Sequence, residues 1–160
     1  MVEAKIGTIA IHENPVWEAK SDFLILVDLE RWGLSGRLEQ LWVRRAGGNL
    51  VEVCCVPFFP YGIRLGDIVE IEVSSNGRHF FERVVKPSNR LNVRLVVDDT
   101  DRIEVIMPVI SVILEDSGCE YEVFKPGYVA ADVPTDSAER YLIRELGHLI
   151  ESNQVTIEKV

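Results

Sequence analysis

Two adjacent cysteines are the residues of this chain whose type and setting could most directly support catalysis. Cys54 and Cys55 open the stretch "CCVPFFPYGIRLGD". A nucleophilic thiol needs a nearby cation or a helix N-terminus to lower its pKa. Both cysteines fall in an expected strand, and no helix start follows them. The pattern therefore favours a structural role, in which one cysteine is a small core residue and the neighbouring aromatic rings fill the interior.

Two prolines follow the cysteines and predict a corner in the chain. Pro57 and Pro60 have no N–H to donate to a strand ladder, so the strand is expected to break there and continue as a loop. Phe59 and Tyr61 would lie at the tip of that loop. Exposed aromatic side chains favour contact with a protein partner, so both are candidate binding residues.

Three aspartates in "VDDTD" form a second candidate site. Asp98, Asp99 and Asp101 follow an expected strand and precede an expected helix. They could bind a divalent cation or a basic partner. Alternatively, Asp99 or Thr100 caps the helix, and the remaining charge favours the positive end of its dipole.

The remaining residues that could do chemistry form no recognisable catalytic pattern. His12, His79 and His148 share no metal-ligand spacing with each other or with the cysteines. There is no glycine-rich phosphate loop and no Ser-His-Asp order. We therefore expect no enzyme, no metal and no cofactor. An enzyme that uses Cys54 or Cys55 is the least favoured alternative.

Composition and charge limit the class of protein. The chain has 160 residues, 47% of them hydrophobic, which suffices for one medium domain or two small ones. Its net charge of −9 attracts basic partners and repels nucleic acid and anionic membranes. The apolar stretch from Ile6 to Ile11 is too short for a signal peptide core. Three cysteines, two of them adjacent, suit a reducing compartment, so we expect a cytoplasmic protein.

The first part of the chain is dense in strand signals. The expected strands are residues 22–29, 38–46, 50–56, 67–73 and 78–86. "GGN" at 47–49 and "SSNG" at 74–77 are hairpin turn signals. Five short strands with tight turns favour a small antiparallel β-barrel over residues 1–86.

The second part alternates strands with helices. Strands are expected at residues 91–97, 119–124, 128–133 and 154–160, with helices at 100–117 and from 136 onward. This βαββαβ order predicts a ferredoxin-like sandwich over residues 90–160. The chain as a whole is therefore expected to be an α+β protein.

Local signals at the two helices define their expected limits. "DSAE" from Asp136 to Glu139 has the spacing of a capping box. Gly118 is expected to end the first helix. Pro108 lies inside that first helix and predicts either a kink or a later start, near Met107.

The outer face of the second sheet is expected to be acidic and poor in aromatic residues. Glu120 and Glu122 belong to it, together with Asp132. RNA-binding modules of this topology carry stacking aromatic rings on that face, so the pattern argues against nucleic acid. Glu120 and Glu122 are instead candidate contacts for a basic protein partner.

Several segments resemble one protein family. "HENPVWEAKSDFLILVDL", "EQLWVRR", "CCVPFFPYGIRLGDIVE" and "YVAADVP" are similar to the bacterial domain-of-unknown-function family 4265. The resemblance runs from about His12 to the last strand, and "VPFF…YG…LGD" is its most specific part. Pro108 and the apolar helix around it depart from the family pattern. The resemblance implies no catalytic residues, and it implies that some proteins of this kind act as immunity proteins beside polymorphic toxins.

Two functions follow as hypotheses. The first is a non-enzymatic protein-binding module, in its sharpest form an immunity protein that neutralises a cognate toxin through a basic surface. The second is an intracellular ligand-binding or regulatory sensor domain, which a formed pocket between the two halves would favour. Neither hypothesis fixes the partner or the oligomeric state.

Overall fold

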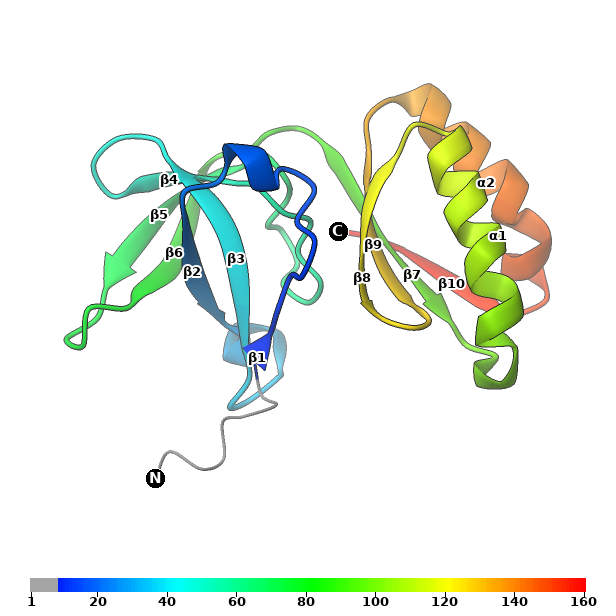
Figure 1. The fold of residues 1–160 in the computed structure, drawn as a ribbon, viewed down its shortest axis with the longest axis horizontal. Coiled ribbons are helices and arrows are strands. Elements are labelled where there is room, and N and C mark those ends of the chain that lie inside the picture. The colour runs from blue at the N-terminus through cyan, green and yellow to red at the C-terminus, as the bar shows by residue number, and fades with distance from the viewer. Residues whose placement is uncertain (1–8) are drawn as a thin grey trace. The chain divides into compact units, whose positions relative to one another are not determined.

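The computed structural model describes residues 9–160, and the chain divides after Asn89 into two compact units (Figure 1). Half of the apolar stretch from Ile6 to Ile11 belongs to the described residues, and Ile6 to Thr8 lie outside them. The molecule is an α+β protein with two sheets and two α-helices in the described part.

The first unit is built on a six-stranded sheet. Its strands are β1 (Ile9–Ala10), β2 (Phe23–Asp28), β3 (Leu38–Arg45), β4 (Leu50–Val53), β5 (Ile68–Val73) and β6 (His79–Lys86). The strand order is β1-β3-β2-β6-β5-β4, and β3 also pairs with β4. The five longer strands lie where the alternation of apolar residues predicts them. Two short 3₁₀ segments, Glu18–Lys20 and Leu29–Trp32, flank β2.

Not all pairings in this sheet are antiparallel, and this corrects the sequence expectation. β1 pairs with β3 in parallel, and β2 pairs with β6 in parallel through Leu26 and Phe80. The parallel direction of the β2–β6 pairing follows from the number of strands between them. Consecutive strands from β2 to β6 alternate in direction, so the first and the fifth of them point the same way when they meet.

Strand β4 is shorter than expected, ending at Val53 rather than at residue 56. The N–H of Cys54 donates to the carbonyl of Trp42 at 2.8 Å, after which the chain leaves the ladder ahead of Pro57. Cys55 still enters the core of this unit. That core comprises Ile25, Val27, Leu29, Leu41, Val43, Val51, Val53, Cys55, Ile63, Val69, Ile71 and Phe81.

The second unit places two helices on one face of a four-stranded antiparallel sheet (Figure 1). Its elements are β7 (Leu91–Val97), α1 (Ile103–Asp116), β8 (Glu120–Lys125), β9 (Tyr128–Val133), α2 (Asp136–Glu151) and β10 (Val155–Lys159). The strand order is β10-β7-β9-β8. Alternate residues of β7, among them Val93, Leu95 and Val97, bury against the inward sides of both helices.

Helix α1 includes Pro108 and begins before it. A 3₁₀ turn over Thr100–Arg102 leads into the α-helix at Ile103, so the later start near Met107 is wrong. No side-chain oxygen caps this helix or the turn before it, and the expected capping by Asp99 or Thr100 is therefore wrong as well. Gly118 follows the helix with a φ of +75°, a conformation that favours glycine.

Helix α2 is capped one residue earlier than expected. The hydroxyl of Thr135 accepts a hydrogen bond from the N–H of Ala138 at 3.0 Å. Thr135 has extended backbone angles, and Asp136 is already the first helical residue. Thr135 is therefore the N-cap, and Asp136 instead places its negative charge in the first turn, where the helix dipole favours it.

Candidate functional site

A buried carboxylate lies beside the aromatic loop of the first unit. Glu39 alternates along β3 with Leu41 and Val43, so all three side chains point to the buried face of the strand. Glu39 has no exposed surface. A buried carboxylate is costly unless hydrogen bonds compensate it, so its partners define its role.

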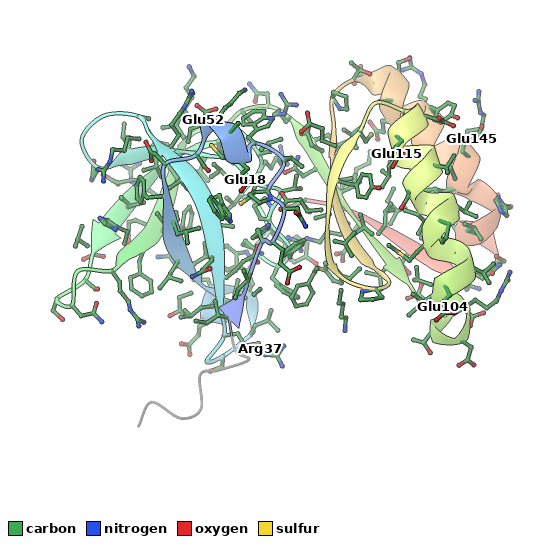
Figure 2. The ribbon with its side chains drawn as sticks, in the orientation of Figure 1. Glu18, Arg37, Glu52, Glu104, Glu115 and Glu145 are labelled. Atoms are coloured by element: carbon green, nitrogen blue, oxygen red, sulfur yellow. The ribbon has the colours of Figure 1, made fainter. Side chains whose placement is uncertain are left out.

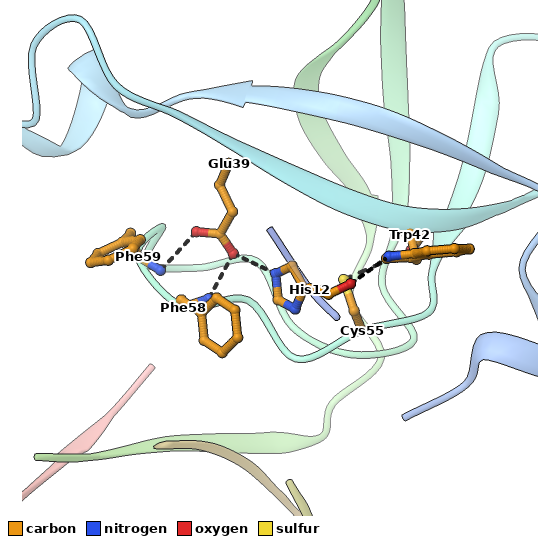
Figure 3. Close-up of polar contacts among 6 residues, drawn as sticks. All are labelled: His12, Glu39, Trp42, Cys55, Phe58 and Phe59. Carbon is orange, nitrogen blue, oxygen red and sulfur yellow. Dashed lines mark hydrogen bonds and ion pairs between the residues drawn. The ribbon is translucent and has the colours of Figure 1, made fainter. Parts of the chain in front are cut away.

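Glu39 accepts hydrogen bonds from the backbone N–H groups of the proline-rich loop (Figure 3). Its Oε1 accepts from the N–H of Phe58 at 2.7 Å, and its Oε2 accepts from the N–H of Phe59 at 3.0 Å. Pro57 and Pro60 have no N–H. One carboxylate therefore satisfies every backbone donor in residues 57–60 and fixes the loop to β3.

His12 completes this cluster from a distant part of the chain. Its Nε2 lies 2.9 Å from Oε1 of Glu39, within hydrogen-bond distance. The imidazole stacks on the ring of Phe58 with centroids 4.1 Å apart. Trp42 Nε1 donates to the carbonyl of His12 at 3.0 Å. The cluster is closed by rings and hydrogen bonds, which indicates a structural anchor.

Two of the cysteines, Cys54 and Cys119, lie in settings that suppress the thiolate. All three cysteines are free and buried. Burial, followed by the charge of Glu52, raises the pKa of Cys54 to about 11. Burial also raises the pKa of Cys119. A thiol with such a pKa is protonated at neutral pH, so the setting of Cys54 does not favour nucleophilic attack.

The two candidate aromatic residues of the loop differ in exposure. Phe59 is half-buried and packs against the core of the first unit. Tyr61 is 47% exposed, and its carbonyl accepts from Trp32 Nε1 at 3.1 Å. Of the pair, Tyr61 presents the larger side-chain surface.

The three candidate aspartates lie between β7 and α1. Asp98 and Asp101 are exposed, and Asp99 is partly exposed. Asp98 accepts a hydrogen bond from the hydroxyl of Thr156 on β10. Within residues 9–160, no three His, Cys, Asp or Glu side chains converge in a way that could hold a metal ion.

The candidate glutamates of β8 differ in the same way as the loop aromatics. Glu120 is exposed, whereas Glu122 is buried. The neighbouring Asp132 of β9 accepts from Arg90 Nε at 2.9 Å and from the side-chain amide of Asn92 at 3.0 Å. Arg90 therefore neutralises Asp132 and Glu122 is not exposed, so of these three acidic residues only Glu120 presents an exposed side chain.

The acidic candidates do not form a single cluster. Glu120 pairs across the sheet with Asp132, which is opposite Asn92 near the start of β7. Asp98 follows the end of β7, at the other end of the same sheet. These acidic residues nevertheless all belong to the second unit. Residues 90–160 contain 14 acidic and 7 basic side chains, a net charge of −7, whereas residues 1–89 contain 12 and 10, a net charge of −2.

Sequence reasoning missed the Glu39 cluster, although one signal for it was present. Glu39 continues the apolar alternation of Leu41 and Val43, which marks a carboxylate on an inward face. Its partners His12 and Phe58 are 27 and 19 residues away along the chain. No local pattern links residues at such separations.

Among the described residues, no helix has both the length and the apolar character needed to cross a bilayer.

Comparison with known proteins identifies the family. No match was found among curated proteins. A hypothetical protein from Neisseria gonorrhoeae has a similar crystal structure, with a TM-score of 0.65 and 21% identity over 84% of this chain and 91% of that one. The model of the family described as "Domain of unknown function (DUF4265)" matches residues 39–157, and the chain therefore belongs to this family.

Proposed function

We propose that this chain is a non-enzymatic protein-binding module whose partner presents a basic surface. The observation that carries the proposal is the uneven charge, because the second unit holds −7 of the net −9. A concentrated field of one sign accelerates encounter with a partner of opposite sign and excludes partners of like sign.

The sharper form of the proposal is an immunity protein that neutralises a cognate toxin in the cytoplasm. It is supported by the earlier resemblance, and an acidic surface could occupy the basic groove of a toxin that acts on nucleic acid. Asp98, Asp99, Asp101 and Glu120 are the exposed or partly exposed acidic residues for such a contact, with Tyr61 on the first unit.

The proposal includes a finer description of both units. A small barrel for the first unit is supported by the unbroken circuit of pairings from β2 through β3, β4, β5 and β6 back to β2. A ferredoxin-like sandwich for the second is supported by its strand order and by both helices on one face. Such folds host many activities, so the charge and not the fold carries the function.

The first experiment captures the partner and then measures binding directly. The tagged full-length chain is incubated with lysate of its own organism at low and at moderate salt, and recovered proteins are identified by mass spectrometry. A recovered basic protein is then purified and titrated against the chain by calorimetry. We expect the affinity to fall as salt rises, because counter-charges are screened. A salt-independent affinity, or no purified partner that binds, would refute the proposal.

The immunity form has its own test. Co-expression of the chain with the recovered partner should restore growth if that partner inhibits growth when expressed alone. A partner that binds tightly but inhibits no growth would leave the binding module in place and remove the immunity role.

A second candidate function, a ligand-binding sensor, is favoured by one feature of the first unit. A hollow of about 280 Å³ is lined by Ile9, Leu24, Ile25, Leu26, Gln40, Arg78 and His79. Apolar side chains together with the guanidinium of Arg78 suit a small carboxylate with an apolar tail. A thermal-shift screen of short-chain fatty and aromatic acids tests it. Stabilisation that Arg78→Gln abolishes would support this candidate, and an unchanged melting temperature throughout the screen would remove it.

A further inference from the structure

Helix α1 exposes a row of valines that its own core does not use. Val105 is 59% exposed, Val109 is 40% exposed and Val112 is 55% exposed. On the opposite side of the helix, Ile106 and Ile110 are buried in the core of the second unit. The helix is therefore apolar on two sides, although only one of them packs against the sheet.

These exposed residues form a continuous ridge, which we call the valine stripe: Val105, Pro108, Val109 and Val112. Positions i, i+3, i+4 and i+7 lie along one side of a helix. The same spacing produces the seam along which two helices pair. Valine is a weaker helix former than the polar residues usual at exposed positions, so the stripe does not serve the helix itself.

Acidic residues predominate at both ends of the stripe. Asp101 and Glu104, with Arg102 between them, lie at its N-terminal end, and Glu115 and Asp116 lie at its C-terminal end, all of them exposed. Figure 2 shows Glu104 and Glu115 near opposite ends of α1. An apolar centre with a charged rim is the usual composition of a protein interface.

The charge of the rim argues against a second copy of this chain as the occupant. If two α1 helices paired in parallel, Glu104 would face Glu104 and Glu115 would face Glu115. If they paired antiparallel, Glu104 of one copy would lie near Glu115 of the other. Because the acidic side chains outnumber Arg102 at the N-terminal end, both ends are net negative, and both arrangements bring like charges together at the edge of an apolar contact, which disfavours them.

We propose that the valine stripe of α1 is a docking surface for an amphipathic helix of another protein, with lysine or arginine at both ends of its apolar face. This inference rests on the proposed function and assigns its surface. The apolar face of the partner helix covers the valines, and its basic residues reach the acidic rim.

The geometry of α1 sets what the partner must present. At 1.5 Å per residue, the valines span roughly 10 Å and the distance from Glu104 to Glu115 is roughly 16 Å along the axis. The partner therefore needs about two turns of apolar residues and basic groups about three turns apart. A flat basic surface without an apolar ridge would leave the stripe uncovered.

The test uses a synthetic probe and needs no natural partner. The probe is a fluorescent 18-residue peptide of leucine and lysine, with the leucines on one side of the helix. Two control peptides have the same composition in scrambled order or glutamate in place of lysine. Binding to the full-length chain is measured by fluorescence anisotropy and located by amide chemical shifts of the ¹⁵N-labelled protein.

We expect the amphipathic basic peptide to bind and to shift the amides of Val105, Val109 and Val112. The double variant Val105→Gln/Val112→Gln should weaken binding at least tenfold. Val73→Gln on β5 is the matched control, because Val73 is 57% exposed, and its affinity should change less than twofold. If the double variant is unstable, Val112→Gln alone gives the same measurement.

Charge is tested separately from apolar contact. Glu104→Gln/Glu115→Gln should weaken binding and flatten its salt dependence, whereas Glu151→Gln on α2 should leave both nearly unchanged. Equal binding of the scrambled peptide, or shifts away from α1, would overturn the inference. So would a dimer of the free protein, observed by sedimentation, that Val112→Gln dissociates.

The two proposals fail in different ways. A natural basic partner that binds the valine variants as tightly as the native chain would refute the valine stripe and leave the protein-binding function in place. Absence of any natural basic partner, together with specific binding of the peptide to α1, would refute the proposed function and leave only the surface.

Discussion

The carboxylate of Glu39 has a role that its type alone does not indicate. Hydrogen bonds from the N–H groups of Phe58 and Phe59, and a third with Nε2 of His12, fix a loop that contains two residues without N–H groups. The segment that first suggested a reactive site is therefore anchored by a residue outside it. These hydrogen bonds compensate the burial of the carboxylate and tie the loop to β3.

Replacing Glu39 by glutamine should destabilise the protein strongly. The amide keeps the shape but offers one acceptor oxygen, and its NH₂ group would face an N–H donor. We expect Glu39→Gln to lower the free energy of unfolding by roughly 2–4 kcal/mol. Urea unfolding followed by circular dichroism measures it. Glu72→Gln, at an exposed position on β5, is the control and should change stability by about 0.5 kcal/mol or less. Equal effects of both variants would contradict the anchoring role.

The raised pKa of Cys54 predicts a loss of stability in alkali. The folded protein holds the thiol protonated up to a pKa of about 11, whereas an unfolded thiol ionises near its ordinary value of 9.0. The stabilisation is therefore complete below pH 9 and is lost as pH rises toward 11. Urea unfolding at several pH values should show a smaller alkaline loss in Cys54→Ala than in the native chain. Identical pH profiles would show that Cys54 ionises equally in both states.

At the residue scale, the sequence predicts those roles of a residue that depend on its neighbours along the chain. The structural role of the cysteines and the break at Pro57 follow from local chemistry. The partners of Glu39 do not, because they come from three separate segments. The exposure of Tyr61 and the half-burial of Phe59 also depend on how the loop is anchored.

At the element scale, the spacing of apolar residues predicts almost every element. Alternation predicts the strands, and a spacing of three to four residues predicts the helices. β7 and β9 have the predicted limits, residues 91–97 and 128–133, because turn signals bound both segments. β1 was missed because it has two residues and exists through its pairing with Leu38 and Glu39. Its position depends on tertiary contact and leaves no periodic signal.

Helix α1 should become more stable when its proline is replaced. Pro108 is exposed and lacks the N–H that would bond the carbonyl of Glu104 four residues earlier. Pro108→Ala should raise the free energy of unfolding by about 1–3 kcal/mol. Urea unfolding measures this gain. Pro134→Ala, outside any helix, should give no gain, because it only increases the freedom of the unfolded chain. A loss of stability in Pro108→Ala would contradict this account.

At the scale of the whole molecule, charge is unevenly divided between the units. The direction of the closing pair between β2 and β6 and the division of charge both depend on the complete chain. The sequence gives the total charge of −9. The structure shows that most of this charge belongs to residues 90–160, which fold as one unit. The local sequence pattern predicts the strands and helices, whereas the pairing of distant strands is known only from the structure.

This excess charge should make stability depend on salt. Like charges in the second unit repel one another when the unit is compact, and salt screens them. Raising NaCl from about 10 to 150 mM should increase the free energy of unfolding by on the order of 0.5–1 kcal/mol. The dependence should be weaker in Glu104→Gln/Glu115→Gln, because fewer charges repel. A fall in stability over the same range would show that attractive ion pairs dominate instead.

The pairing of β3 has a consequence for how the first unit opens. β2 runs along one edge of β3, while β1 pairs with its start and β4 with its end on the other side. A strand paired along one edge and at both ends of the other resists fraying from either end. Amide protons of Leu41 and Val43 should therefore exchange with deuterium only when the whole unit unfolds. Their protection would report the global stability of that unit, residue by residue, without denaturant.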